Sequence, residues 1–293
     1  MDDSEIGIGE KIRRKIFCRI HGRELYGLYS KEQFRPRKLL RFEVHLTDHC
    51  NLNCIGCFHF SSIAPVKYLD VEKFIRDCKC LSELSGGKCE SIHLMGGEPL
   101  LHPSFEDICT ISRKYFHGGE IKIVTNAILL QSRKDSFWSN LNSNRVGIII
   151  TRYPLNIDYN SIEQKAKKMN VCLSYWRESN DKKQYKIPIC LEGKQNIRKS
   201  FYQCHRPNIC IQLRDGKLFT CVTAAYIDIF CTYFNKNLKV SNKDYIDIYK
   251  AKSIEDIFKF LCKPIPFCRY CNNNSIVRDI DWGVSKKDIS EWV

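Results

Sequence analysis

Long hydrophobic runs are missing from this chain of 293 residues. No apolar stretch approaches the roughly 20 residues that a transmembrane helix needs, and the longest buried-looking run, 146–151, has the length of a strand. The opening segment, MDDSEIGIGEKIRRK, is acidic and then basic with no apolar stretch behind it, unlike a secretory signal. The sequence therefore predicts a cytoplasmic protein without a membrane partner.

Acidic residues are also few: 33 Asp and Glu stand against 47 Lys and Arg, which gives a formal net charge of +14. Such a charge can attract nucleic acid. The basic residues are spread along the chain, however, and their densest group lies between Lys11 and Arg41. We favour a solvated basic surface that attracts an anionic substrate over a nucleic-acid partner.

Cysteine, in contrast, is abundant, with 17 residues. The number is odd and no export signal supports a disulfide framework. In a reducing compartment, clustered cysteines are more typical of metal ligands, while isolated ones serve as small buried residues. We expect a place in the core for these cysteines on predicted helices and strands: Cys78, Cys80, Cys89, Cys109 and Cys172.

Repeats and low-complexity segments are absent, and short β-rich runs alternate with helical runs between residues 40 and 176. Strands are predicted over 40–46, 90–95, 121–124, 145–151, 171–176 and 185–189, and helices over 70–84, 104–116, 132–141 and 161–169. Alternating strands and helices pair in parallel through right-handed crossovers. We therefore predict an α/β fold with a partial (β/α)6 TIM-like barrel, and keep a doubly wound open sheet as the alternative. In both folds, chemistry belongs at the carboxyl ends of the strands.

The alternating pattern breaks after residue 181. Beyond it, the runs 209–213 and 218–221 flank Asp215-Gly216 and predict a β-hairpin, and 253–261 predicts a helix. We divide the chain into a basic extension (1–39), a core (40–199) and a small cysteine-rich module (200–293).

Three cysteines with the spacing C-x3-C-x2-C, Cys50, Cys54 and Cys57, directly follow the first predicted strand. Three thiolates on one short loop can converge on one iron–sulfur cluster. They leave one iron without a protein ligand, and that iron can bind a small molecule, much as a catalytic zinc keeps an open position. A zinc loop with His49 or His59 as fourth ligand is the competing interpretation.

This loop resembles that of the radical S-adenosylmethionine (radical SAM) superfamily. The resemblance implies a [4Fe–4S] cluster that binds the amino and carboxylate groups of S-adenosylmethionine. It also implies a 5′-deoxyadenosyl radical that takes hydrogen from a substrate, with an electron donor such as flavodoxin or ferredoxin. The family usually places an aromatic residue near adenine just before the third cysteine. Here that position is Gly56, and Phe58 is the candidate to replace it.

A second motif, Gly96-Gly97-Glu98-Pro99, follows the second predicted strand. Two glycines at a strand end let the backbone approach a ligand closely, and a carboxylate can accept hydrogen bonds from an ammonium group. The motif resembles the family's GGEP sequence, which implies contact with the amino group of S-adenosylmethionine.

Polar residues also end the third and fourth predicted strands, at Thr125-Asn126 and Thr151-Arg152. At the mouth of a barrel, Thr125, Asn126 and Thr151 could contact ribose or substrate. Arg152 could pair with the carboxylate of S-adenosylmethionine or with a substrate anion. Ordinary capping of strand ends explains these residues equally well.

The last third of the chain is rich in cysteines: Cys204, Cys210, Cys221, Cys231, Cys262, Cys268 and Cys271. Their spacing resembles a shortened SPASM module, or twitch domain. The resemblance implies one auxiliary [4Fe–4S] cluster on Cys204, Cys221, Cys268 and Cys271, and only one because no second set of cysteines follows. A four-cysteine zinc site is the alternative, and Cys210 could replace Cys204.

Together these features predict a radical SAM enzyme whose substrate lies between the barrel mouth and the auxiliary module. Epimerisation, dehydrogenation or rearrangement of a sugar or other small molecule is favoured, because no winged-helix peptide-binding domain precedes the barrel. Modification of a ribosomal peptide is one alternative. A zinc protein that binds nucleic acid is another, and the identity of the metal separates it from the enzyme.

Overall fold

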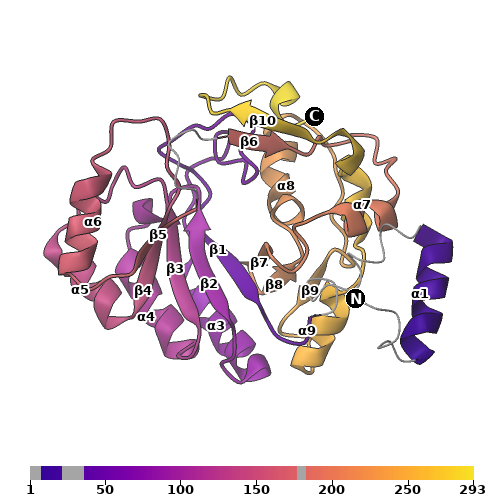
Figure 1. Cartoon of the computed structure of the whole chain (residues 1–293), viewed down its shortest axis with the longest axis horizontal. Coiled ribbons are helices and arrows are strands. Elements are labelled where there is room, and N and C mark those ends of the chain that lie inside the picture. The colour runs from indigo at the N-terminus through magenta and orange to yellow at the C-terminus, as the bar shows by residue number, and fades with distance from the viewer. Residues whose placement is uncertain (1–7, 22–35, 177–182) are drawn as a thin grey trace.

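The computed structural model describes residues 8–21, 36–176 and 183–293. An eight-stranded mixed sheet forms its centre, with the strand order β5-β4-β3-β2-β1-β7-β8-β9 (Figure 1). These strands are β1 (Arg41–Thr47), β2 (Ser91–Gly96), β3 (Glu120–Thr125), β4 (Val146–Ile150), β5 (Leu173–Tyr175), β7 (Ile211–Arg214), β8 (Lys217–Phe219) and β9 (Tyr245–Asp247). Strands β1 to β5 run parallel, and β7 pairs in parallel with the other side of β1. Strands β8 and β9 complete the sheet in antiparallel fashion.

Four helices alternate with the parallel strands: α3 (Val71–Ser85), α4 (Phe105–Tyr115), α5 (Asp135–Ser143) and α6 (Tyr159–Lys168). Helix α3 begins where the Asp70 side chain accepts a hydrogen bond from the backbone N–H of Lys73, and ends at Gly86 in the left-handed conformation. The helices pack on one face of the sheet and enclose the main hydrophobic core with it.

Strand β1 decides which side chains face the opposite side of the sheet. Its alternate residues Phe42, Val44 and Leu46 belong to the main core. Since successive side chains of a strand point to opposite faces, Glu43 and His45 point away from that core. Both are nevertheless buried, because the C-terminal part of the chain covers this second face.

A second hydrophobic core forms around α8 (Val222–Tyr233), which packs with Phe60, Phe267 and Trp292. The remaining helices are α1 (Ile8–His21), α7 (Ile197–Gln203) and α9 (Ile254–Leu261), and the short 3-10 turns are η3 (Pro99–Leu101), η4 (Pro266–Tyr270), η5 (Asn273–Ser275) and η6 (Ile289–Glu291). Helix α1 lies at the edge of the molecule (Figure 1), where Phe17 packs edge-on against Tyr202. No helix of the described ranges is long and apolar enough to cross a membrane.

The predicted α/β class and a mostly parallel central sheet are confirmed. The sixth strand predicted over 185–189 is wrong in position. Instead β6 (Lys183–Lys186) pairs with β10 (Val277–Asp281) in a separate antiparallel pair, and β7 is the sixth parallel strand. Within the described residues the edge strands β5 and β9 do not pair, so the sheet stays open rather than closing.

The predicted hairpin is also present as β7 and β8, and both turn residues have positive φ, 48° at Asp215 and 72° at Gly216. It lies beyond the predicted domain boundary at residue 200, yet it extends the same sheet as β1. The division into 1–39, 40–199 and 200–293 stays a prediction.

Candidate active site at the carboxyl ends of the parallel strands

One cavity opens at the ends of the parallel strands, and most of the predicted site residues line it. These residues are Cys50, Cys54, Cys57, Phe58, Gly96, Gly97, Thr125, Asn126 and Thr151. They come from the loop after β1 and from the ends of β2, β3 and β4. Of the residues predicted around the first cysteine group and S-adenosylmethionine, Glu98 and Arg152 are not among those that line the cavity.

The three thiols of the first cysteine group lie close enough for their charges to interact. Burial raises the pKa of the Cys50 thiol well above its usual range, and the neighbouring Glu98, Cys57 and Cys54 raise it further. Its sulfur accepts a hydrogen bond from the backbone N–H of Leu52 at 3.3 Å. Thiols in this environment stay protonated until a cation replaces the proton.

The two glycines after β2 allow the cysteine loop to lie directly against the strand end. A Cβ atom at Gly97 would stand 1.8 Å from the carbonyl oxygen of His49, and one at Gly96 would stand 2.3 Å from that of Thr47. The N–H of Gly97 donates to the Thr47 carbonyl at 2.8 Å. Any side chain here would push the loop away.

Glu98 lies behind these glycines and is fully buried. One carboxylate oxygen accepts from the Thr125 hydroxyl at 2.7 Å and from the N–H of Leu100 at 3.2 Å, and the other accepts from the N–H of Asn126 at 3.0 Å. Burial raises the pKa of Glu98 to about 7, although these hydrogen bonds act to lower it. In this structure Glu98 fixes the end of β3, and its contact with S-adenosylmethionine stays a prediction.

Arg152 turns toward helix α6 and strand β5. Its guanidinium forms an ion pair with Glu163 at 3.5 Å and lies 3.9 Å from the ring centre of Tyr175. A second ring, that of Tyr159, lies at 4.9 Å. Its proposed pairing with a carboxylate of a ligand therefore has no support from its position and stays a prediction.

The C-terminal segment covers the cysteine loop, which the sequence did not indicate. The N–H groups of Ile55 and Gly56 donate to the Gly283 carbonyl (2.8 Å) and the Glu291 carboxylate (3.0 Å). The Trp292 indole donates to the Cys57 carbonyl at 2.9 Å. Gly56 has φ 56°, and a Cβ there would stand 3.1 Å from the carbonyl oxygen of Glu291. This contact explains glycine where the related family has an aromatic residue.

Two aromatic residues beside the sulfurs were also missed. The Trp282 indole N–H donates to the sulfur of Cys54 at 3.1 Å. Tyr153 lines the cavity, and burial together with the sulfur of Cys54 raises its pKa well above the usual range. Its ring centre lies 5.8 Å from that of Trp282.

Glu43 and His93 line the side of the cavity that lies along the strands. Glu43, His93 and Gln212 are direct neighbours across β1, β2 and β7. Glu43 accepts from the Gln212 amide at 2.5 Å and lies 3.4 Å from Nε of Arg41. Burial raises the pKa of Glu43 to about 7 and lowers that of His93 to about 3, so the imidazole is neutral at pH 7. The alternation within 41–47 was the available signal for Glu43.

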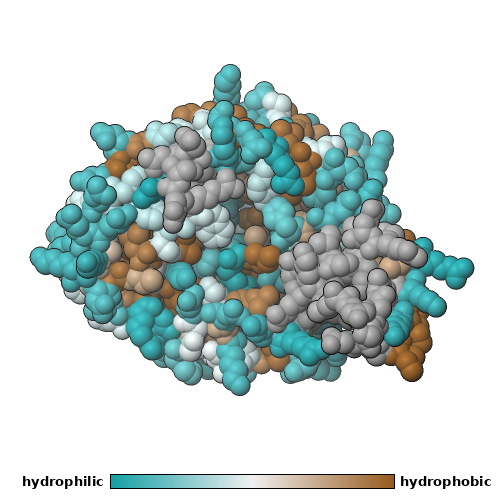
Figure 2. Space-filling view, viewed as in Figure 1, coloured by the Kyte–Doolittle hydropathy of each residue, from teal (hydrophilic) through white to brown (hydrophobic). Residues whose placement is uncertain are grey.

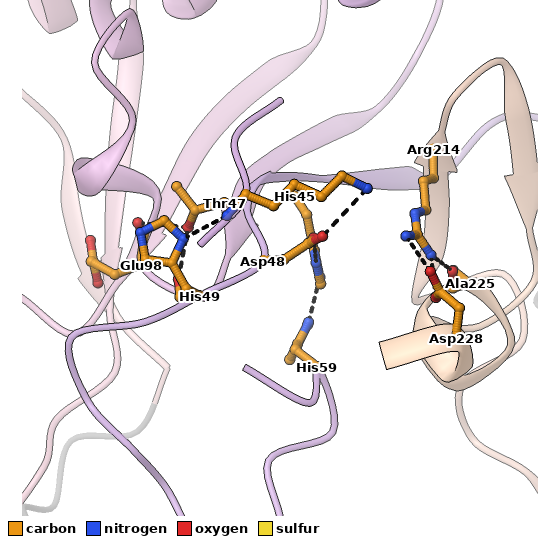
Figure 3. Close-up of polar contacts among 10 residues, drawn as sticks. His45, Thr47, Asp48, His49, His59, Glu98, Arg214, Ala225 and Asp228 are labelled. Atoms are coloured by element: carbon orange, nitrogen blue, oxygen red, sulfur yellow. Dashed lines mark hydrogen bonds and ion pairs between the residues drawn. The ribbon is translucent and has the colours of Figure 1, made fainter. Parts of the chain in front are cut away.

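Polar and ring contacts connect β1 and the cysteine loop with helix α8, and Figure 3 shows two polar groups among them, one around His45 and one between Arg214 and Asp228. Nε2 of His45 and Nδ1 of His59 are 2.6 Å apart, and the His45 ring stacks on Tyr226 of α8 at 3.6 Å. The carboxylate of Asp48 lies 3.7 Å from Nδ1 of His45. Nearby, Arg214 forms a bidentate pair with Asp228 at 2.7 and 2.8 Å. The loop is thus fixed from both cores.

The four cysteines predicted as auxiliary ligands come together from separate segments. Burial raises the pKa of Cys271, and the neighbouring Cys221 and Cys204 raise it further. Burial likewise raises the pKa of Cys268, and the neighbouring Cys271, Cys221 and Cys204 raise it further. Cys210 instead lines the first cavity. In the described residues, no three His, Cys, Asp or Glu side chains converge closely enough to hold a single metal ion, and ligation by these cysteines stays a prediction.

Residues 44–169 match the model of the Radical SAM superfamily. The chain carries a radical SAM superfamily domain. Such a domain implies S-adenosylmethionine and a [4Fe–4S] cluster as its cofactors, and the matched range contains the loop with Cys50, Cys54 and Cys57. The resemblance of the last third of the chain to a SPASM or twitch module stays a prediction.

Curated relatives match only part of this chain. It is 31% identical over 93 residues to GTP 3′,8-cyclase of Chlorobaculum tepidum, covering 32% of this chain and 27% of the relative. It is 27% identical over 162 residues to GTP 3′,8-cyclase of Synechocystis sp., and the match covers 50% of this chain and 48% of the relative. The chain thus spans less than half the length of each. The domain and these relatives indicate an enzyme.

Solved structures similar to this chain include BtrN in complex with AdoMet and 2-DOIA, with 16% identity, a TM-score of 0.48, and coverage of 80% of this chain and 93% of BtrN. AdoMet-bound anSMEcpe is 20% identical with a TM-score of 0.38, covering 46% and 43%. These likenesses are too distant to carry an argument about function.

Proposed function

We propose that this protein is a radical SAM enzyme that takes a hydrogen atom from a sugar or another small polar molecule. The observation that supports this proposal best is that Cys50, Cys54 and Cys57 all line one cavity, which Gly96 and Gly97 also line. The donor set fits the group: three partly exposed thiols on one loop suit a [4Fe–4S] cluster with one open iron. Such a cluster with S-adenosylmethionine supplies a 5′-deoxyadenosyl radical.

The chain's own residues would bind, orient and shield these groups. Gly96, Gly97, Thr125, Asn126 and Thr151 line the cavity beside the thiols and are the proposed contacts of S-adenosylmethionine.

The aromatic side chains would keep water from the sulfurs. The Trp282 indole N–H donates to the sulfur of Cys54, and Tyr153 and Phe58 line the same cavity. Exclusion of water protects a reactive species from side reactions. Phe58 packs on Tyr185 with ring centres 4.8 Å apart, so its proposed contact with adenine would be made from a fixed position.

The four-cysteine group is proposed to hold one auxiliary [4Fe–4S] cluster on Cys204, Cys221, Cys268 and Cys271. The mutual effect of these thiols on one another's pKa supports their proximity. Cys210, which lines the substrate cavity, lies near Cys204. A substrate in the first cavity would then lie beside the auxiliary group, and an external flavodoxin or ferredoxin would deliver the electron.

Metal content after anaerobic reconstitution tests this function. We expect about eight irons per wild-type chain and about four in the Cys50→Ala/Cys54→Ala/Cys57→Ala variant. The electron spin resonance of reduced wild type should change on addition of S-adenosylmethionine, and that of the variant should not. Cys172→Ala, which removes an exposed thiol, is the control and should retain wild-type iron. Zinc without iron in all three proteins would contradict the proposal.

A further inference from the structure

The cavity is lined by a buried guanidinium that forms no ion pair within 4 Å among the described residues, although the buried Glu43 lies close enough for the two charges to interact. Arg206 lines the cavity and is only 5% exposed. Its Nη1 donates to the Thr223 hydroxyl at 2.9 Å, whereas Nη2 has no hydrogen-bond partner in the described part of the chain. The guanidinium carbon lies 4.0 Å from the ring centre of Phe58, a cation–π distance. A buried guanidinium in this state requires an anion.

Two further polar atoms along the same cavity are buried and unpartnered among the described residues. They are Oγ of Ser61 and Nδ1 of His93, and each residue is 4% exposed. Neutral polar groups of this kind are normally satisfied by a partner. Their presence in the same cavity as Arg206 indicates that the occupant of the cavity is polar as well as charged.

A second guanidinium, that of Arg41, lines the same cavity. Its Nε donates to the Ile209 carbonyl at 2.7 Å and lies 3.4 Å from Glu43, and its Cζ lies 5.8 Å from the ring centre of Trp176. Glu43 is the carboxylate nearest to it, and its own charge is disfavoured by burial. The surroundings of the cavity therefore carry more positive than negative charge.

We propose that Arg206 and Arg41 bind an anionic group, a carboxylate or a phosphate, of a small polar substrate whose hydroxyl or amino groups bond Ser61 and His93. This inference rests on the proposed function, because it places the substrate in the radical SAM cavity. Guanidinium groups held by aromatic rings keep their outer N–H donors directed at planar or tetrahedral oxyanions. The substrate class is thereby narrowed to acids and phosphate esters.

Arg206 has two competing roles, and each predicts a different result. It could offset the negative charge of an auxiliary cluster, since Cys204 and Cys210 both interact with it. It could also bind the carboxylate of S-adenosylmethionine. In the first case its removal costs iron, and in the second it costs affinity for S-adenosylmethionine.

Calorimetric titration of the anaerobically reconstituted full chain tests the proposal, with glucose 6-phosphate, glucuronate and glucose as probes at constant ionic strength. We expect at least one anion to bind, and glucose to bind at least tenfold more weakly. The probe that binds more tightly assigns phosphate or carboxylate. Arg206→Met should weaken binding of the anion at least tenfold. Arg206→Lys should bind the anion with an affinity between those of wild type and Arg206→Met. Arg198→Met, which removes an exposed arginine of α7, should bind as wild type does.

Iron content and titration with S-adenosylmethionine are measured on each variant. Unchanged iron, unchanged affinity for S-adenosylmethionine and loss of anion binding in Arg206→Met would support the inference. Equal anion affinity in Arg206→Met and wild type, no binding of either anion, or loss of iron or S-adenosylmethionine affinity would overturn it. The Cys50→Ala/Cys54→Ala/Cys57→Ala variant separates the two proposals. If it still binds the anion, the proposed anion site is supported independently of whether the protein is a radical SAM enzyme.

Discussion

Two kinds of single residue shape the site of this protein. Some lack a side chain and so allow a close backbone contact, and others place a polar group in a buried position. Gly97 belongs to the first kind, since the carbonyl of His49 occupies the place of a Cβ atom. Glu43 belongs to the second kind, since it is 4% exposed on the polar face of β1. Each can be altered with a minimal change, so each provides a sharp test.

Replacing Gly97 with alanine should displace the cysteine loop, because the new methyl group would stand 1.8 Å from a backbone oxygen. Overpacking of this kind costs about 1–3 kcal/mol. We expect a lower midpoint of thermal unfolding and less iron after reconstitution. Gly118→Ala has no heavy atom within 4 Å of its added Cβ and should match wild type. Equal iron in both variants would disprove the proposed role of this close contact.

The carboxyl group of Glu43 should make stability depend on pH. Burial raises its pKa from 4.5 to about 7, so the folded state holds a proton that the unfolded state releases above pH 4.5. The free energy of unfolding should therefore fall as the pH rises from about 4.5 to 7, by up to about 3 kcal/mol.

Urea denaturation in reducing buffers between pH 5 and 7.5 measures this slope. Glu43→Gln removes the titration and should flatten the curve relative to wild type. Glu72→Gln changes an exposed residue of α3 and should leave the slope as it is. Parallel curves for wild type and Glu43→Gln would mean that the carboxyl does not titrate in this window.

At the level of elements, local patterns were sufficient where the chain alternates. Helix α3 has its cap at Asp70 and its stop at Gly86, both visible in the sequence, and the strands β1 to β5 were found near their predicted ranges. Their carboxyl ends could therefore be predicted to meet. Buried α8 was missed because it is apolar nearly all round, so it has no amphipathic period. Cys172, expected in the core, is exposed.

Pairing between distant segments could not be predicted. Nothing in Lys183–Lys186 indicates that its partner is β10, almost a hundred residues later, and nothing marks β7 as the neighbour of β1. The turn that joins β7 to β8 was predictable, because Asp215-Gly216 is a local signal for positive φ. Turn chemistry is local, whereas sheet order depends on the packing of the whole chain.

Gly216→Ala should therefore weaken the hairpin that extends the central sheet. Its φ is +72°, and an added Cβ would stand 2.4 Å from the ring of Tyr249. We expect a loss of about 2 kcal/mol in the free energy of unfolding, seen as a lower urea midpoint. Gly9→Ala, in α1 with open space around it, should be neutral or slightly stabilising. An unchanged midpoint for Gly216→Ala would show that the turn tolerates a side chain.

At the scale of the whole molecule, the chain returns at its end to cover its first functional loop. The two cores meet next to that loop. His45, on the strand that leads into the loop, stacks on Tyr226 of α8. The face seen in Figure 2 is mainly hydrophilic. The cofactor loop is thus held by both the sheet and the C-terminal segment, and its stability should depend on residues more than 200 positions away.

Glu291 is the residue through which that dependence can be measured. Its carboxylate accepts from the N–H of Gly56 at 3.0 Å, from the Ser285 hydroxyl at 2.7 Å and from the N–H of Lys286 at 2.7 Å. Glu291→Gln turns one acceptor oxygen into a donor that faces other donors, and hydrogen bonds to charged groups contribute about 1.5–3 kcal/mol each. The segment should then open more often over the cysteine loop.

We expect a chelator such as bathophenanthroline to remove iron from reconstituted Glu291→Gln at least about threefold faster than from wild type, which is the minimum that partial loss of one such bond produces. Asp279→Asn makes the same chemical change at an exposed position of β10 and should lose iron at the wild-type rate. The fast phase should account for about half of the iron, because only one of the two proposed clusters lies under this segment. Acceleration of all the iron would instead indicate general loosening of the fold, and no acceleration would mean that the segment does not protect the loop.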